Sequence, residues 1–198
     1  MLYFAYGSNM DSAQMKCRCP LAKFVSRAKL PAHRLAFTLK SAKRDCGVAD
    51  VLPDQAKDVW GVVYELPDDE LKNLDKREGY RPGGPYDRIN YTREDHYVWR
   101  EGDAKRPLLV ALYRGHPQLD PPLPSDDYKR LIVDGAKHWN LPAEYIRELE
   151  SIQTEAYARG NDPRPVKAKT AILSSLARRA PCGGTRKGRN LIAPASTL

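Results

Sequence analysis

The sequence predicts an α+β protein built on a largely non-parallel sheet or a small barrel. Segments typical of strands fill the first part of the chain, and capped helical segments become frequent only later. No internal repeat is present, and 198 residues suit one well-packed domain rather than two large ones. The hydrophobic fraction of 41% and the charged fraction of 29% are typical of a globular protein.

The predicted strands are rich in β-branched and aromatic residues or alternate between apolar and polar residues. They cover residues 2–6, 23–39 (two strands or one bent strand, because of Pro31), 47–52, 58–66, 86–99 and 108–113. The predicted helices begin at a capping residue or a proline and have acidic residues or a cap in the first turn. They cover residues 11–19, 67–78 with Gly79 as the stop, 125–139 and 141–154.

The first stretch, YFAYGSNM, ends an apolar strand with a glycine and two small polar residues directly before a helical segment. Such a turn exposes backbone N–H groups, and the following helix adds the positive end of its dipole. Both features favour an anion. The stretch therefore predicts an anion site around Gly7, Ser8 and Asn9.

The segment PDDELKNLDKREG contains the most informative carboxylate. Leu71, Leu74 and Glu78 stand at positions i, i+3 and i+7, so they share one stripe of a helix. Burial and the C-terminal end of the helix dipole both disfavour a charged Glu78, which suits a group that gives and takes a proton near neutrality. Two ordinary alternatives remain open: the last turn directs Glu78 into water, or an arginine pairs with it.

Other chemistry is weakly indicated. Cys17, Cys19 and Cys46 lack the usual CxxC pairs and accompanying histidines, so we expect no metal. Ser8 lacks the GxSxG elbow of a serine hydrolase. Tyr6 and Tyr113 could also be ordinary core aromatics.

No apolar run reaches the roughly 18 residues that a membrane helix needs. The N-terminus lacks the pattern of a secretory signal, so we expect a cytoplasmic protein without membrane contact.

The positive charge is confined to the end of the chain. Residues 157–198 hold nine Lys/Arg and one acid, a net +8, whereas basic and acidic residues cancel over residues 1–156. We therefore expect a domain over residues 1–156 and a basic, weakly ordered extension over residues 157–198. The extension could contact a polyanion weakly.

Four segments carry a family resemblance: LYFAYGSNM, DVWGVVYEL, LDKREG and PLPSDDYKRLIVDGAKHWNLPAEYI. In order and spacing they resemble the γ-glutamylcyclotransferase family (the AIG2-like, butirosin-processing-like fold) over about residues 2–154. The resemblance implies a small mixed β-barrel flanked by helices. For the oligomeric state we expect a monomer or a homodimer. The same resemblance implies an enzyme that releases 5-oxoproline from γ-glutamyl compounds with neither metal nor cofactor.

The resemblance also implies roles for particular residues. Glu78 would be the catalytic acid/base, Tyr113 and Tyr128 would be pocket tyrosines, and Tyr86 is a further candidate. The substrate-binding segment would comprise Tyr3, Phe4, Ala5, Tyr6, Gly7, Ser8 and Asn9. Compared with the animal enzyme, the loop after Glu78 is longer and the loop over residues 40–47 is shorter, both on the leaving-group side. The departing amine therefore stays open: an amino acid, a polyamine, an ε-lysyl amine or an aminoglycoside-like amine.

The expected reaction needs no protein nucleophile, because the α-amine of the substrate attacks its own γ-carbonyl. One carboxylate can take the proton of that amine and give it to the departing amine. The alternative is a non-catalytic regulatory or binding protein on the same fold, whose basic extension contacts nucleic acid or another acidic partner.

Overall fold

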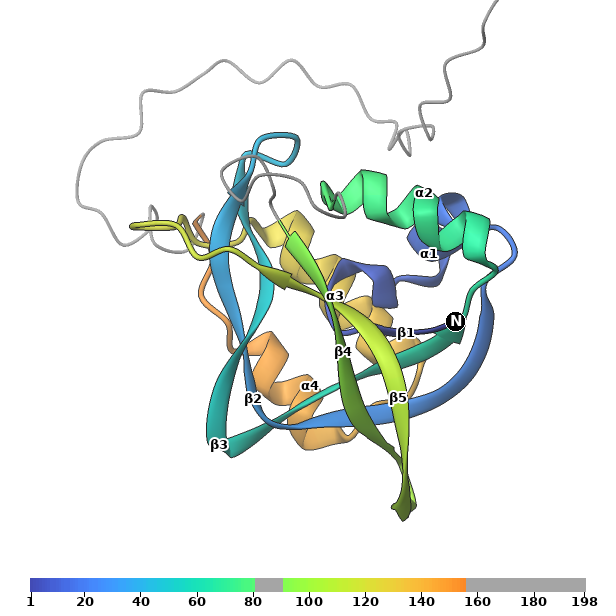
Figure 1. Cartoon of the computed structure of the whole chain (residues 1–198). Helices are drawn as coiled ribbons and strands as arrows, with labels where there is room; N and C mark the ends of the chain where they lie inside the picture. Colours follow the sequence, from blue (N-terminus) through green and yellow to red (C-terminus); the bar gives the residue numbers. More distant parts are fainter. Residues whose placement is uncertain (81–90, 156–198) are drawn as a thin grey trace, which may run out of the picture. The chain divides into compact units, whose positions relative to one another are not determined.

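The described part of the computed structural model, residues 1–80 and 91–155, forms a closed β-barrel with flanking helices (Figure 1). The strand order is β1-β3-β2-β4-β5. The β1–β5 pairing is parallel and the other pairings are antiparallel, which confirms the mixed barrel expected from the sequence. Tyr86, the boundary near residue 156 and the extension over residues 157–198 lie outside the described residues.

The elements follow one another in the order expected from the sequence. They are β1 (Leu2–Ala5), the 3₁₀ turn η1 (Ser8–Met10), α1 (Ser12–Arg18), β2 (Lys23–Ser41), β3 (Cys46–Glu65), α2 (Asp68–Glu78), β4 (Tyr91–Arg100), β5 (Asp103–Gly115), α3 (Asp126–His138) and α4 (Ala143–Glu150).

Two long strands, β2 and β3, differ from the shorter ones that the sequence predicts. β2 is a single strand with a register shift between Pro31 and His33, where Ala32 has a φ of 54°. Proline cannot donate to the ladder, and a bulge absorbs the irregularity without ending the strand. β3 continues through the gap between the two predicted segments, because β2 pairs with it on both sides of the bulge, as in the pair His33↔Pro53.

The helix ends behave as the sequence predicts. The Asp11 side chain accepts a hydrogen bond from Gln14 N, and the Ser125 hydroxyl accepts one from Tyr128 N. Gly79 ends α2 in the left-handed conformation, with a φ of 75°. α4 is shorter than expected and ends at Glu150.

Close packing of α3 fixes the turn that follows β1. A Cβ added at Gly135 would lie 2.6 Å from the carbonyl carbon of Met10, so the helix backbone approaches η1 directly. About one turn later, at the C-cap of α3, the Trp139 indole donates to Met10 O over 2.8 Å. η1 is therefore held between the barrel and α3.

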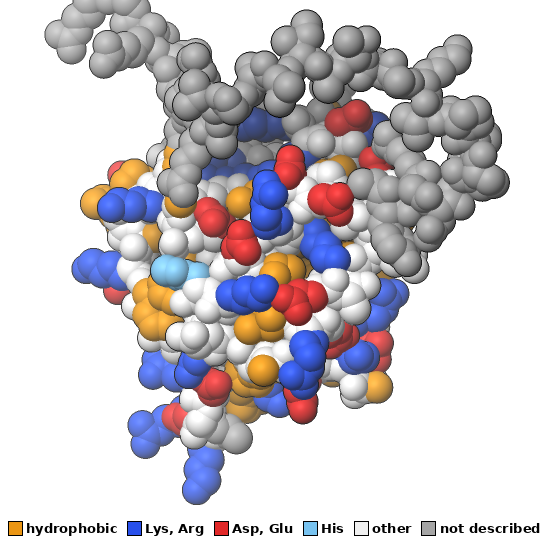
Figure 2. Space-filling view, turned by 180° about the vertical axis from the view of Figure 1, so that it is seen from behind, with side chains coloured by type: hydrophobic (Ala, Val, Ile, Leu, Met, Phe, Trp, Pro, Cys, Tyr) orange, Lys and Arg blue, Asp and Glu red, His pale blue; other side chains and the backbone are white. Residues whose placement is uncertain are grey.

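The visible surface supports the charge analysis. In Figure 2, basic and acidic side chains of the described residues are interspersed with small apolar areas. This mixture agrees with the cancelling charges of residues 1–156. None of the helices in the described part is long and apolar enough to cross a membrane.

Candidate functional site

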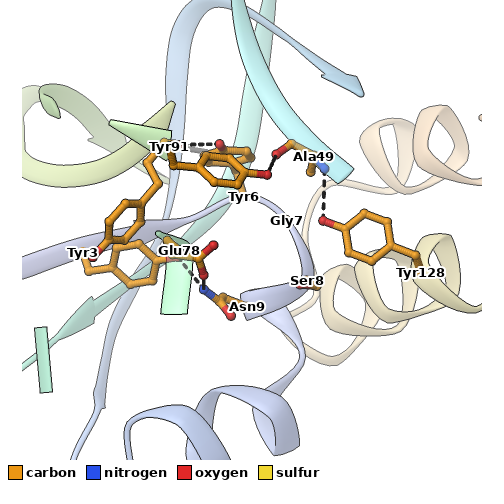
Figure 3. A pocket seen from close by; sticks show the side chains of 10 residues that line it. Tyr3, Tyr6, Gly7, Ser8, Asn9, Ala49, Glu78, Tyr91 and Tyr128 are labelled. Atoms are coloured by element: carbon orange, nitrogen blue, oxygen red, sulfur yellow. Dashed lines mark hydrogen bonds between the residues drawn. The ribbon is translucent and has the colours of Figure 1, made fainter. Parts of the chain in front are cut away.

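A pocket lies where β1 ends in the GSN turn, and side chains from α2, the barrel strands and α3 surround it (Figure 3). Its lining residues are Tyr3, Tyr6, Gly7, Ser8, Asn9, Ala49, Glu78, Tyr91, Tyr113 and Tyr128. The structure thus brings together residues from both ends of the domain.

Most residues predicted for the site line this pocket, but Phe4 and Ala5 do not. Both are 0% exposed and belong to the barrel core, where the Phe4 ring lies against Gly61. Successive side chains of a strand point to opposite faces, so Phe4 cannot share the pocket face of Tyr3. Of the predicted substrate-binding segment, Tyr3 and Tyr6 through Asn9 line the pocket, and their contact with substrate stays a prediction.

Two lining residues were not predicted. Tyr91 lies at the start of β4 and donates to Ala49 O over 2.8 Å. Its only sequence signal was its place in the alternating segment 86–99. Ala49 contributes its backbone and a methyl group to the pocket, and no residue-type signal could have identified it.

Glu78 lies at the end of α2 with its side chain 17% exposed, beside the buried Leu71 and Leu74 of the predicted stripe. Arg18 Nη1 contacts its Oε1 at 2.8 Å, and Asn9 Nδ2 donates to the same oxygen over 3.4 Å. The arginine pairing considered as an alternative is therefore present. No residue of the described part hydrogen-bonds to Oε2, so one oxygen is anchored and the other is open.

Asn9 links Glu78 to the rest of the pocket. Its amide nitrogen also donates to the Tyr3 hydroxyl over 2.7 Å. Its carbonyl oxygen accepts from Arg18 at 2.9 Å and from Gln14 Nε2 at 3.1 Å. These bonds assign both ends of the amide, so its donor side faces Tyr3 and Glu78.

The pocket tyrosines are held as neutral hydrogen-bonding groups. Burial, and then the charge of Glu78, raise the pKa of Tyr3 well above its usual value. Burial also raises the pKa of Tyr113, whose hydroxyl donates to Asp75 Oδ1 over 2.7 Å. Tyr6 donates to the backbone oxygen of Tyr113, and burial raises its pKa as well.

Gly7 allows the turn to approach β3. A Cβ added at Gly7 would lie 3.0 Å from the Ala49 Cβ and 3.7 Å from the Tyr128 hydroxyl. Ala49 N donates to that hydroxyl over 3.0 Å. The φ of Gly7 is −112°, so the glycine is needed for close approach rather than for an unusual backbone conformation.

The start of η1 provides backbone donors. Its internal bonds begin with Met10 N to Gly7 O at 3.0 Å, so the amides before Met10 precede the first bond of the turn. The Ser8 hydroxyl accepts from Gln14 Nε2 at 2.9 Å. An amide cannot remove a proton, so this contact does not activate Ser8 as a nucleophile.

Cys17, Cys19 and Cys46 are the cysteines whose sequence spacing was weighed as a metal site. Cys19 and Cys46 are buried free thiols, and burial raises the pKa of Cys19 to about 11. Among residues 1–80 and 91–155, no three His, Cys, Asp or Glu side chains are grouped as metal ligands.

Comparisons with known proteins agree on one family. The AIG2-like family model matches residues 58–149. The γ-glutamylcyclotransferase of Bos taurus is 33% identical over 162 residues, covering 79% of this chain and 80% of its own. The Homo sapiens γ-glutamylcyclotransferase is 32% identical over the same shares of both chains.

Solved structures show the same similarity. A structure of a γ-glutamyl cyclotransferase is 27% identical and superposes with a TM-score of 0.69 over 86% of this chain and 93% of that one. A Homo sapiens structure is 30% identical, with a TM-score of 0.70 over 79% of this chain and 89% of that one.

Proposed function

The chain belongs to the γ-glutamylcyclotransferase family, and we propose that it releases 5-oxoproline from a γ-glutamyl amine or γ-glutamyl amino acid without a cofactor. One observation carries the proposal. Glu78 reaches the pocket with Oε1 fixed by Arg18 and Asn9, whereas Oε2 has no partner in the described part of the chain.

The proposed reaction is an intramolecular acyl transfer. The substrate's α-amine attacks its γ-carbonyl carbon, and a five-membered ring closes as the new C–N bond forms. Glu78 Oε2 accepts the proton that the attacking amine loses. The bond from the γ-carbon to the departing amine then breaks, and Glu78 returns the proton to that amine. The products are 5-oxoproline and the free amine, with no water consumed.

Arg18 and Asn9 position the acid/base in this mechanism. Their contacts at 2.8 and 3.4 Å both use Oε1, so they restrict rotation of the carboxylate without occupying Oε2. A proton shuttle held in one orientation avoids the cost of ordering it at the moment of reaction.

The GSN turn would recognise the negative groups of the substrate. Its backbone amides precede the first internal bond of η1 and can donate to the α-carboxylate or to the developing oxyanion. The Tyr3 hydroxyl supports this assignment, because it accepts from Asn9 and its own proton has no acceptor in the described part of the chain.

A substrate panel tests the proposal. A γ-glutamyl amino acid, a γ-glutamyl polyamine and ε-(γ-glutamyl)lysine are incubated with the full chain, and 5-oxoproline and free amine are quantified by mass spectrometry. We expect equal amounts of both products from at least one compound. Release of glutamate in place of 5-oxoproline would identify a hydrolase and contradict the proposal.

A binding role is the second candidate, because the net charge of +8 lies wholly in residues 157–198. Counterion release predicts that affinity for RNA or heparin would fall steeply with added salt. Filter binding at two salt concentrations, with a chain ending at residue 156 as control, measures this contribution. Binding that survives the truncation would place the contact elsewhere.

A further inference from the structure

A second arginine, Arg44, stands beside the pocket in the turn between β2 and β3. Its Cζ lies 4.9 Å from the centroid of the Tyr128 ring, so the guanidinium covers one of the lining aromatics. Its Nη2 donates to Gln14 Oε1 over 2.7 Å. Gln14 in turn donates to Ser8 and Asn9, which are lining residues.

Within residues 1–80 and 91–155, Arg44 lacks the carboxylate partner that Arg18 has. Arg18 forms an ion pair with Glu78 at 2.8 Å. No carboxylate of residues 1–80 and 91–155 lies within 4.0 Å of the Arg44 guanidinium, and the neighbouring Asp45 pairs with Lys40 at 2.6 Å. A guanidinium has five N–H donors, and the bond to Gln14 uses one of them. This side of the pocket therefore has a positive charge with donors to spare.

We propose that Arg44 is a specificity-determining residue that binds a carboxylate of the substrate; this inference rests on the proposed cyclotransferase function. The fork of a guanidinium matches a carboxylate, and charge-assisted hydrogen bonds are the stronger ones. The carboxylate has two sources: the α-carboxylate of the glutamyl group or the carboxylate of a departing amino acid. In both cases Arg44 disfavours a cationic polyamine as the leaving group.

The surroundings hold Arg44 ready for this role. Stacking on Tyr128 and the bond to Gln14 restrain the half-buried side chain from two directions. Gln14 also contacts the Asn9 carbonyl oxygen at 3.1 Å, and Asn9 contacts Glu78. One chain of hydrogen bonds thus connects the proposed carboxylate-binding group with the acid/base.

The test compares three variants on three substrates. Arg44→Gln removes the charge, Arg44→Lys keeps it without the planar fork, and Lys43→Gln makes the same charge change at the exposed neighbouring position. The substrates are γ-glutamylalanine, its form amidated at the alanine carboxylate, and its form amidated at the glutamyl α-carboxylate. kcat and KM are measured by 5-oxoproline release, and inhibition constants replace them where turnover is too slow.

For γ-glutamylalanine we expect Arg44→Gln to lower kcat/KM about 10- to 100-fold, mainly through KM, because a hydrogen-bonded charge is lost. Arg44→Lys should recover part of this loss, and Lys43→Gln should stay within about twofold of the wild type. If Arg44 binds one of the two carboxylates, amidation of that carboxylate should abolish the difference in kcat/KM, or in inhibition constant, between Arg44→Gln and the wild type. The amidated form that does so identifies the carboxylate.

Two results would overturn the inference. An equal fall on all three substrates would mean that Arg44 only supports Tyr128, and no fall on any would mean that it has no role. Both results leave the proposed function intact, provided that the wild type releases 5-oxoproline. Absence of 5-oxoproline from every wild-type reaction would contradict the proposed function itself.

Discussion

Two carboxylates near the pocket, Asp50 in β3 and Glu78 at the end of α2, have opposite surroundings. Asp50 is 0% exposed. Its Oδ2 accepts from the Thr38 hydroxyl, and its Oδ1 accepts from Val51 N and Gly115 N, each over 2.7 Å. Glu78 keeps 17% of its side chain exposed, and its contacts with Arg18 and Asn9 both fall on Oε1.

The different hydrogen bonding of the two carboxylates distinguishes a structural role for Asp50 from the acid/base role proposed for Glu78. Structural donors engage both oxygens of Asp50, and these donors join β2, β3 and the end of β5 behind the pocket. Among the described residues, Glu78 is held through Oε1 alone, which leaves Oε2 for the pocket that Glu78 lines. Acid/base catalysis needs a positioned carboxylate with a free oxygen, and only Glu78 of this pair meets that condition.

The largest effect is expected from a substitution of Glu78, the carboxylate proposed to act as acid/base. Glu78→Gln keeps the size and one acceptor oxygen but cannot shuttle a proton. We expect kcat for 5-oxoproline release to fall about 10²- to 10⁴-fold, whereas the thermal melting temperature stays near that of the wild type. Retention of more than half of the wild-type rate would remove Glu78 from the mechanism.

Gly7 lies between the surroundings of the two carboxylates. Its turn leads to Asn9, which contacts Glu78, and its Cα faces Ala49, the neighbour of Asp50. The Cβ of Gly7→Ala would lie 3.0 Å from the Ala49 Cβ, and Gly7→Val adds two further methyl groups. Overpacking costs about 1–3 kcal/mol, so we expect a graded loss of substrate affinity that is severe for valine. Equal KM values for Gly7→Val and wild type would show that the turn does not contact substrate.

A smaller effect is expected when the acid-to-amide change is made at Asp50. Asp50→Asn keeps an acceptor for Val51 N and Gly115 N, and the Thr38 hydroxyl can rotate to accept from the new amide. We expect a loss of about 1 kcal/mol in unfolding free energy with nearly normal kcat, as urea denaturation and 5-oxoproline assays would show.

Asp50→Ala serves as the matched contrast, because it removes the buried acceptor of Val51 N, Gly115 N and the Thr38 hydroxyl. It should cost about 3 kcal/mol of unfolding free energy. A loss of kcat in Asp50→Asn as large as that of Glu78→Gln would end the distinction between the two carboxylates.

The smallest effect is expected from removal of metal ions. Neither Asp50 nor Glu78 binds a metal in the proposed mechanism, so dialysis against EDTA should leave the rate of 5-oxoproline release unchanged. The assay is repeated after addition of zinc. A rate that falls with EDTA and returns with zinc would revive a site built from Cys17, Cys19 and Cys46.

The sequence by itself determined the local features on which the site depends. The spacing of Leu71, Leu74 and Glu78 predicted one helical stripe, and Gly79 predicted the end of α2. The predicted cap at Ser125 is present at the start of α3, and Tyr128, a pocket tyrosine implied by the family resemblance, lines the pocket. These features follow from backbone periodicity and capping, which act over a few residues.

Only the tertiary structure decided which groups meet in the pocket. Arg18 lies 60 residues from Glu78 in the chain, and Ala49 and Tyr91 reach the pocket through barrel pairing. Strand alternation separates Phe4 from Tyr3, but only the structure showed that Ala5, on the same side of the strand as Tyr3, is buried in the core and does not line the pocket. Periodicity tells which residues share a face, but close packing of separate elements decides what that face contacts.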